Sequence, residues 1–268
     1  GFVFGPLIGG FLAKYGYAIT GYTAAGFSMI AFLLTLFYLP ESNLNRGVQV
    51  QSKRSLFNIQ AAKKIFTKPD LTVLMLLFFI LTFSVANIYG TFALLGLKVY
   101  HFTDLENGYM YGIVGLTSAI VQGGLLNYLS KFMNQTKMII FGSFLMMIGL
   151  VLIPYGGTFL GLAIIVTILS LGIGSLQPTL LSLISEVTSE SEQGITLGLN
   201  QSFSAFARVL GPLWGGFAFE FLGYPFPFLT GAAFTFLIFL ISVFYLPKIL
   251  HLHELSKKKN LSSQNNDV

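Results

Sequence analysis

The sequence predicts an all-α polytopic membrane protein, and three observations support that prediction. Only 9% of the 268 residues are charged and 54% are hydrophobic, whereas soluble domains carry roughly 25% charged residues. The chain is a succession of apolar runs of about 20 residues, the helix length that crosses a hydrocarbon core. It lacks the segments of about 10 residues with alternating polarity that are typical of a membrane β-barrel. It also has no cysteine, which excludes disulfides and thiolate metal sites.

The apolar runs define one partial span followed by seven full ones. Because backbone polar groups in lipid must be bonded within the segment, spans this long and apolar are helices. The partial span is expected at 1–13, inside an apolar stretch without an initiator Met, so we expect a fragment whose N-terminal part is missing. The full spans are expected at 17–39, 71–97, 107–129, 138–156, 159–185, 194–219 and 225–247.

The basic residues of the connecting segments indicate the orientation, because Lys and Arg concentrate in cytoplasmic loops. If every span crosses the membrane once, twelve of these Lys and Arg residues lie on one side, in the 40–70 loop, the 130–137 turn and the C-terminal tail. Only Lys14 and Lys98 lie on the other side. We therefore expect the 40–70 loop and the C-terminus to be cytoplasmic. The expected location of this multi-pass protein is a bacterial inner (plasma) membrane, although the basic residues indicate only its orientation.

An internal repeat is the strongest pattern in the chain. Residues 5–11 read GPLIGGF and residues 211–217 read GPLWGGF, and two shorter matches follow both copies in register. Both copies begin a pair of spans with the same orientation, which predicts a parallel repeat about an axis along the membrane normal. With a six-helix unit, four helices precede the chain, and the whole protein has about 400 residues.

This repeat predicts the domain organisation. Residues 1–39 are the end of an N-terminal bundle (helices 5–6), and residues 40–70 are a cytoplasmic central loop. Residues 71–247 are a complete C-terminal six-helix bundle (helices 7–12), and residues 248–268 are a cytoplasmic tail. The first bundle is therefore incomplete in this chain.

The glycine and proline pattern resembles that of a known family. The GxxxGPxxGG pattern of residues 1–10 is similar to the helix-5 signature of antiporters in the major facilitator superfamily. The stretches at 172–185 and 193–212 resemble helices 10 and 11 of its drug/proton antiporters, the group that includes tetracycline efflux proteins. The resemblance covers essentially the whole chain. One departure is the turn near Gly123 and Lys131, where Asn127-Tyr128 stands in place of the acidic–basic core of the family motif.

The resemblance implies two six-helix bundles around a central cavity, with alternating access by rocking. It implies a secondary active transporter that exports small lipophilic molecules or drugs in exchange for protons. The implied partners are a small-molecule substrate, a proton and the lipid bilayer, without nucleic acid or cofactor, and the full-length protein is expected to work as a monomer. A uniporter or symporter of sugars or metabolites is the alternative within this class, and a non-transporting membrane sensor or scaffold is the alternative outside it.

Enzyme chemistry has no basis in the sequence. The three histidines, His101, His251 and His253, lie in an outer loop and in the tail, away from any Ser or carboxylate constellation within a span. A metal or nucleophile site therefore has no candidate ligands or base. We expect no enzymatic activity.

The repeated motif supplies the first set of candidate functional residues. Small residues four apart let helix backbones approach closely, and Pro removes a backbone hydrogen bond. The motif residues either shape and seal the interface between the half-domains or simply pack tightly. They are Gly1, Gly5, Pro6, Gly9, Gly10, Gly211, Pro212, Gly215 and Gly216.

Polar residues within the spans supply the second set. Arg208 is the only charge well inside a span, where charge is costly. With Asn200 and Ser204 it recurs at a spacing of four, which places the three on one helix face. They either line the translocation path or tie helices together, as do the three amides Asn87, Gln122 and Gln177.

Two further features lie near the same helices. Pro178 is a candidate hinge, although Pro is also common in such helices. Glu186, Glu190 and Glu192 cluster at the inner end of their spans. They either pair with loop cations at an inner gate or belong to a solvated loop.

Overall fold

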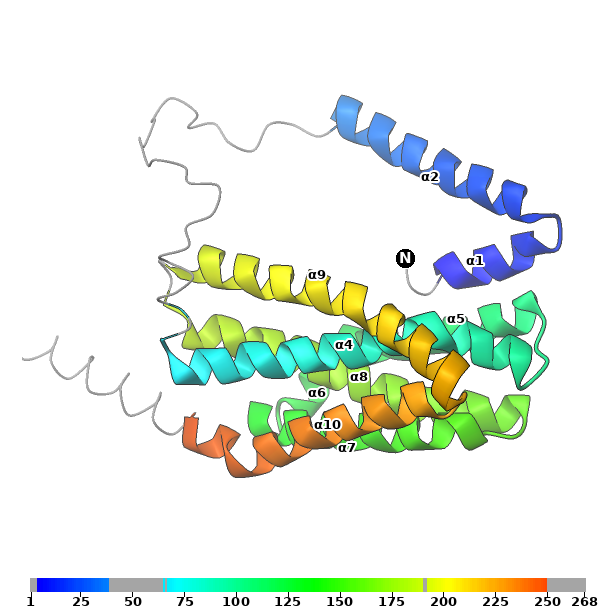
Figure 1. Cartoon of the computed structure of the whole chain (residues 1–268). Helices are drawn as coiled ribbons and strands as arrows, with labels where there is room; N and C mark the ends of the chain where they lie inside the picture. Colours follow the sequence, from blue (N-terminus) through cyan, green and yellow to red (C-terminus); the bar gives the residue numbers. More distant parts are fainter. Residues whose placement is uncertain (1–3, 39–64, 66, 190–191, 250–268) are drawn as a thin grey trace, which may run out of the picture.

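The computed structural model describes residues 4–38, 65, 67–189 and 192–249, and in these ranges it is helical throughout apart from short connections (Figure 1). The long helices are α1 (Phe4–Ala13), α2 (Tyr17–Tyr38), α4 (Pro69–Lys98), α5 (Asp104–Ile120), α7 (Gln135–Leu152), α8 (Phe159–Val187), α9 (Gln193–Phe217) and α10 (Phe226–Phe244). Shorter segments extend three of them: η1 (Val121–Leu125) with α6 (Leu126–Leu129), η2 (Ile153–Tyr155) and η4 (Ala218–Leu222). The predicted all-α class is confirmed.

Each predicted span contains a helix, and polar residues cap α5 and α7, which each begin three residues earlier than predicted. At the start of α5, the Thr103 hydroxyl accepts from the Glu106 backbone N–H, and the Glu106 carboxylate accepts from that of Thr103, which makes a capping box. At the start of α7, Asn134 Oδ1 accepts from the Lys137 backbone N–H at 3.0 Å. These caps satisfy N–H groups that a helix leaves free in its first turn.

Six of the described helical segments are long and apolar enough to cross a membrane, and α9 is not among them. This helix is long enough at 25 residues. It carries Gln193, Asn200, Gln201 and Arg208, which lower its mean hydropathy. A polar helix of this length gains more from contact with protein or an aqueous cavity than from lipid.

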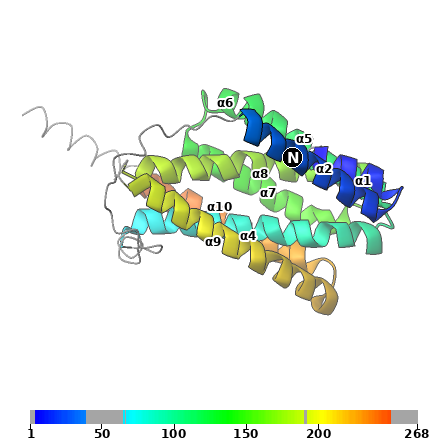
Figure 2. The same cartoon turned by 90° about the horizontal axis from the view of Figure 1, so that it is seen from above.

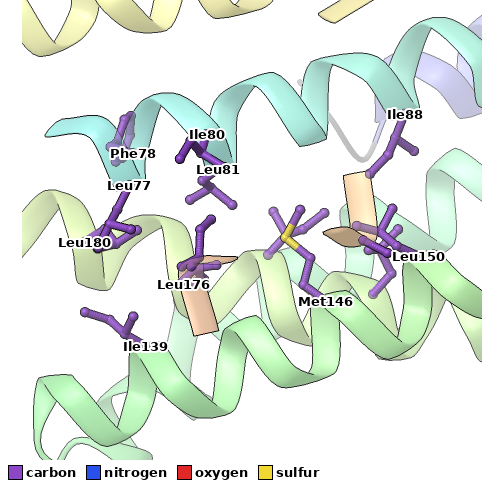
Figure 3. Close-up of a cluster of buried hydrophobic side chains, with 14 of the residues drawn as sticks. Leu77, Phe78, Ile80, Leu81, Ile88, Ile139, Met146, Leu150, Leu176 and Leu180 are labelled. Atoms are coloured by element: carbon purple, nitrogen blue, oxygen red, sulfur yellow. The ribbon is translucent and has the colours of Figure 1, made fainter. Parts of the chain in front are cut away.

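Helices α4, α7 and α8 enclose the main hydrophobic core, seen in close-up in Figure 3. Leu77 and Leu81 of α4, Leu176 and Leu180 of α8 and Met146 of α7 are all fully buried there. Small residues bring α7 and α8 close together. A Cβ added to Gly172 would lie 2.5 Å from the Met146 backbone nitrogen, which leaves no room for a side chain.

Helices α1 and α2 form a hairpin beside the remaining helices (Figures 1 and 2). Helix α1 packs against α5, whereas α2 diverges from the bundle and has no buried residue. The hairpin therefore meets the rest of the described chain mainly through α5. The division into two bundles at 40–70 stays a prediction, because most of that loop lies outside the described residues.

Two helices continue into π-helical segments, η1 after α5 and η4 after α9. A π-segment inserts an extra residue into a helical turn and is frequent at functional sites. In η1, Cβ atoms added to Gly123 and Gly124 would meet nothing within 4 Å. These glycines therefore face open space.

Candidate functional site

Helix α9 turns a stripe of small and polar residues toward the bundle, where it packs against α4. The stripe has helical spacing, with steps of three or four residues. Its buried members are Thr196, Asn200, Ser204, Ala207, Gly211 and Gly215. The polar part of the helix is thus enclosed by protein, and large apolar side chains such as Phe206 and Leu213 are exposed on the other side.

The three candidate residues of α9, Asn200, Ser204 and Arg208, differ in burial. Asn200 and Ser204 are each 1% exposed, and the Ser204 hydroxyl donates to the Asn200 backbone carbonyl at 2.8 Å. Arg208 is exposed. Each step of four residues rotates the side chain by about 40° around a helix of 3.6 residues per turn, so a residue eight positions on has left the buried face. A role for these residues in the translocation path stays a prediction.

Asn87 lies in the interior of the bundle, where α4, α9 and α10 meet. Its side chain is fully buried, and its Nδ2 donates to the Pro227 backbone carbonyl at 2.5 Å. Its Oδ1 has no hydrogen-bond partner among the described residues. A Cβ added to Gly215 would lie 2.2 Å from this oxygen, so the amide fits there only because residue 215 is glycine.

The remaining polar candidates are on exposed surfaces. Gln122 lies in the π-segment η1 and Gln177 in α8, and both side chains are exposed. Pro178, which follows Gln177, is half-buried within α8, which continues on both sides of it. The predicted path and hinge roles of these three residues remain untested.

The second copy of the glycine–proline motif forms the contact between α9 and α4. A Cβ on Gly211 would lie 2.8 Å from the Asn87 backbone nitrogen. Pro212 packs against Gly90 of α4, where an added Cβ would lie 3.1 Å from the proline Cβ. Gly216 faces open space, with nothing within 4 Å of an added Cβ. Gly211 and Gly215 therefore allow two helix backbones to touch.

The first copy of the motif uses a different glycine. A Cβ on Gly10 would lie 3.0 Å from the Asp104 backbone carbonyl oxygen and 3.1 Å from Gly108 Cα, both in α5. Gly5 has nothing within 4 Å, and Gly9 has only a Thr20 methyl at 4.0 Å. Gly1 and the side chain of Pro6 lie outside the described residues. Helices α1 and α5 therefore touch at Gly10.

A polar contact without a signal in the sequence lies beside Gly10. The Tyr17 hydroxyl donates to Asp104 Oδ2 at 2.8 Å and so connects α2 with α5. The two residues are 87 positions apart. Tyr17 lies in a short match of the repeat, Gly16-Tyr17 with Gly223-Tyr224, and Asp104 lies in no motif. Sequence pattern alone could not have brought them together.

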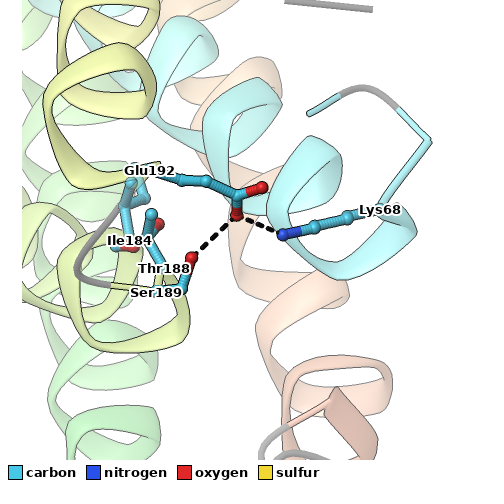
Figure 4. Close-up of polar contacts among 5 residues, drawn as sticks. All are labelled: Lys68, Ile184, Thr188, Ser189 and Glu192. Atoms are coloured by element: carbon cyan, nitrogen blue, oxygen red, sulfur yellow. Dashed lines mark hydrogen bonds and ion pairs between the residues drawn. The ribbon is translucent and has the colours of Figure 1, made fainter. Parts of the chain in front are cut away.

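At the opposite end of α4, an ion pair joins the residues that immediately precede two helices (Figure 4). Lys68 Nζ lies 2.5 Å from Glu192 Oε2, with the two side chains 44% and 17% exposed. The Ser189 hydroxyl donates to the same carboxylate at 2.9 Å. Nearby, Gln135 Nε2 donates to Glu186 at 2.8 Å. Of the two interpretations of the glutamate cluster, pairing therefore applies to Glu192; Glu190 lies outside the described residues.

Long apolar helices that pack through glycine contacts, with the more polar α9 against α4, define a multi-pass integral membrane protein. The chain belongs to the Major Facilitator Superfamily, whose family model matches residues 1–212 and 123–264. This is a superfamily of transporters rather than of enzymes.

Curated relatives include bacterial resistance proteins. The chain is 26% identical to Multidrug resistance protein 1 of Bacillus subtilis (strain 168) over 232 residues, 86% of this chain and 58% of the relative. It is 24% identical to Multidrug resistance protein 2 of the same strain, over 85% of this chain and 57% of the relative. It is 23% identical to the Quinolone resistance protein NorA of Staphylococcus aureus (strain COL), over 82% of this chain and 55% of the relative. The chain thus spans little more than half the length of these relatives.

Among solved structures, the human organic anion transporter MFSD10 (TETRAN) is similar with a TM-score of 0.60 and 24% sequence identity. The match covers 64% of this chain and 40% of that chain. At this identity the likeness supports the fold alone.

Proposed function

We propose that the protein is a secondary active transporter that exports small lipophilic molecules, including drugs, in exchange for protons. Membership of a transporter superfamily supports the class, and the similarity to proteins named for multidrug and quinolone resistance supports the substrates. The proposed location is a bacterial plasma membrane, with the 40–70 loop and the C-terminus in the cytoplasm and the full-length protein acting as a monomer.

The observation that carries this proposal is the contrast between two kinds of packing. Helices α4, α7 and α8 share an extensive apolar core, whereas the α1–α2 hairpin meets that bundle through the packing of α1 on α5, closest at Gly10, and one hydrogen bond from Tyr17. A bundle with its own apolar core beside a separate helix–helix contact suits two half-domains that rock against each other to open a central site alternately on each side.

Within this proposal, residues 1–39 end the first bundle and residues 71–247 form the second, with the motif glycines at their interfaces. The exposed residues Gln122, Gln177 and Arg208 face the translocation path, and Pro178 allows α8 to bend. The buried pair Asn200 and Ser204 and the interior amide Asn87 stand behind that surface and hold α9 in place.

Transport of a fluorescent dye tests the proposal. The full-length protein is reconstituted in vesicles with an imposed pH gradient, and ethidium movement is recorded by fluorescence. We expect movement against the dye gradient that stops when an ionophore collapses the pH gradient. Protein-free vesicles are the control. If ethidium and other lipophilic dyes stay in place, drug export is refuted, and uptake of a sugar or other polar solute would instead favour a uniporter or symporter.

A further inference from the structure

Two buried asparagines share the same environment in the described part of the chain. Asn87 of α4 is fully buried, and Asn107 of α5 is 6% exposed. The Oδ1 atom of each is buried and makes no hydrogen bond among the described residues. A buried acceptor without a partner costs free energy, so each of these oxygens needs a physical explanation.

A glycine of a neighbouring helix faces each oxygen. The Oδ1 of Asn107 lies against Gly96 of α4, at the place where a side chain of residue 96 would begin. In the same way, the Oδ1 of Asn87 lies against Gly215 of α9. Glycine has a hydrogen in this direction, and Cα–H···O contacts of this kind recur between packed helices. We call the arrangement an amide–glycine contact.

The closest neighbours of Gly96 all belong to the Asn107 side chain. The three atoms nearest to a Cβ added on Gly96 are Oδ1, Cγ and Nδ2 of Asn107, with Cγ at 2.9 Å and Nδ2 at 3.0 Å. At Gly215, by contrast, the neighbours also include the Thr91 methyl at 2.8 Å. Asn107 is therefore the group that sets how closely α5 approaches α4 at Gly96.

The same turn of α5 meets the hairpin on another side. A Cβ added to Gly10 of α1 would lie 3.1 Å from the Cα of Gly108, the residue after Asn107. The Asp104 backbone carbonyl oxygen lies 3.0 Å from the same Cβ. Successive residues of a helix point about 100° apart, so Asn107 and Gly108 face different neighbours. The first turns of α5 thus lie between α4 and α1.

The attachment of this end of α5 to α4 depends on a few side chains. Helix α5 packs more extensively on α8 than on α4. One further link to α4 is the hydrogen bond from the Tyr111 hydroxyl to the Tyr89 backbone carbonyl at 3.2 Å. Asn107 is the link adjacent to Gly108, and so the one closest in the chain to the contact with the hairpin.

We propose that Asn107 is a positioning residue for transport, seated against Gly96 so that the first turns of α5 stay on α4 while the hairpin moves at Gly10. Separation of the two parts then displaces the bundle as one body, instead of pulling the end of α5 away from it. The role in transport rests on the proposed export function, whereas the amide–glycine contact does not.

Thermal unfolding of the full-length protein in detergent tests the amide–glycine contact. Gly96→Ala forces a methyl into the space of the amide and Asn107→Ala empties that space, so each should lower the Tm by a few degrees. In Gly96→Ala/Asn107→Ala the methyl fills the space that the amide has left, so the Tm should lie above that of Gly96→Ala alone. A wild-type Tm for Gly96→Ala, or a double variant that loses the sum of the two single losses, overturns the contact.

Hydrogen exchange shows whether Asn107 holds the end of α5. Asn107→Ala should speed exchange of the backbone N–H groups of residues 104–111 several-fold, because the first turns of α5 open from α4 more often. Asn87→Ala is the matched control, since it removes the same kind of amide from the contact with Gly215 and should leave exchange in 104–111 unchanged. A wild-type exchange rate in Asn107→Ala, or equal acceleration by Asn87→Ala, refutes the positioning role.

Turnover separates positioning from folding. Ethidium transport in vesicles is divided by the number of ethidium sites counted by fluorescence titration, so that unfolded protein does not contribute. Asn107→Ala should lower turnover per site several-fold with an unchanged Kd for ethidium. Asn127→Ala removes an exposed amide and should change neither quantity.

Wild-type turnover per site in Asn107→Ala would mean that the residue serves folding alone, and the role in transport is refuted. If wild type transports no ethidium, the export function fails and the transport role of Asn107 fails with it. The unfolding and exchange results still decide whether Asn107 holds α5 on α4.

Discussion

At the scale of single residues, the same motif has different effects in its two copies because its neighbours differ. Gly10 touches α5 and Gly216, its counterpart in the repeat, faces open space. Gly211 and Gly215 lie against the backbone of α4, whereas Gly5 has nothing within 4 Å. The same glycine pattern thus marks positions that tolerate a methyl group and positions that do not.

The tightest of these positions gives a direct prediction. In Gly215→Ala the new methyl would lie 2.2 Å from Asn87 Oδ1, and overpacking of this kind costs about 1–3 kcal/mol. We expect a lower Tm by thermal unfolding in detergent. Gly216→Ala is the control on the next residue; with open space around it, the change should be neutral or slightly stabilising, because Ala favours helix over Gly.

A second variant checks that the clash with Asn87 is the cause. Asn87→Ala removes the oxygen and the hydrogen bond to Pro227, so alone it should also lower the Tm. In the double variant Gly215→Ala/Asn87→Ala the methyl no longer meets Asn87 Oδ1, and its remaining neighbours are the Thr91 methyl at 2.8 Å and the Asn87 backbone carbonyl oxygen at 3.1 Å. The stability lost in the double variant should therefore be smaller than the sum of the two single losses. If the loss in the double variant equals the sum of the two single losses, the clash between the methyl at position 215 and Asn87 is not the cause.

At the scale of elements, the sequence predicted where helices lie but not which way each faces. Hydropathy locates a helix because a span must be apolar over its whole length, and α2 and α4 end within a residue or two of the predicted limits. The orientation of a side chain depends on packing, so Asn200 is buried while Arg208 on the same helix is exposed. The π-segment η1 was also missed, since an extra residue in a turn has no compositional signal.

Contacts between elements were the least predictable part of the site. The bond from Tyr17 to Asp104 and the ion pair from Lys68 to Glu192 join residues 87 and 124 positions apart. Neither pair repeats in the sequence or matches a motif. Only the arrangement of the helices brings these residues together, so sequence could name Glu192 as a candidate without naming its partner.

The ion pair at the starts of α4 and α9 gives a prediction that depends on its two helices. A negative charge is favourable at a helix N-terminus and a positive one unfavourable. Glu192 precedes α9 and Lys68 precedes α4. Glu192→Gln therefore loses both the pair and a favourable end charge, and we expect a cost of about 1 kcal/mol in unfolding free energy. Lys68→Gln also loses the pair, but it removes an unfavourable positive charge from the N-terminus of α4. Its cost in unfolding free energy should therefore be smaller.

The control for this prediction is the second described ion pair. Lys98 and Glu220 are 57% and 64% exposed with 3.4 Å between Nζ and Oε2, and such exposed pairs contribute little because solvent screens them. Thermal unfolding in detergent measures all three variants, and Glu220→Gln should leave the Tm unchanged. Equal losses for Glu192→Gln and Lys68→Gln would argue that helix-end electrostatics has no part in the effect.

At the scale of the whole molecule, the described chain consists of a hairpin and a bundle that differ in how they are held. The bundle has a continuous apolar core from α4 to α10, while α2 has no buried residue and α1 touches α5. A body with a tight core moves as a unit, and relative motion takes place at the contact between two such bodies. The contact at Gly10 is therefore where we expect the two parts to separate during transport.

A disulfide across that contact tests the motion, since the chain has no cysteine of its own. A Cβ on Gly10 lies 3.1 Å from Gly108 Cα. Gly10→Cys/Gly108→Cys therefore places two cysteines directly across the contact, where the helices must part by a few tenths of an ångström to accommodate a disulfide. Oxidation should stop dye transport in vesicles and reduction should restore it. The matched pair Gly90→Cys/Pro212→Cys joins α4 to α9, with 3.1 Å between the added Cβ on Gly90 and the proline Cβ. Both helices lie on the bundle side of the contact, so this second cross-link should leave transport intact if the bundle moves as one body. Transport that survives the first cross-link would mean that the halves do not part at Gly10, and transport lost equally with both would mean that motion within the bundle is required.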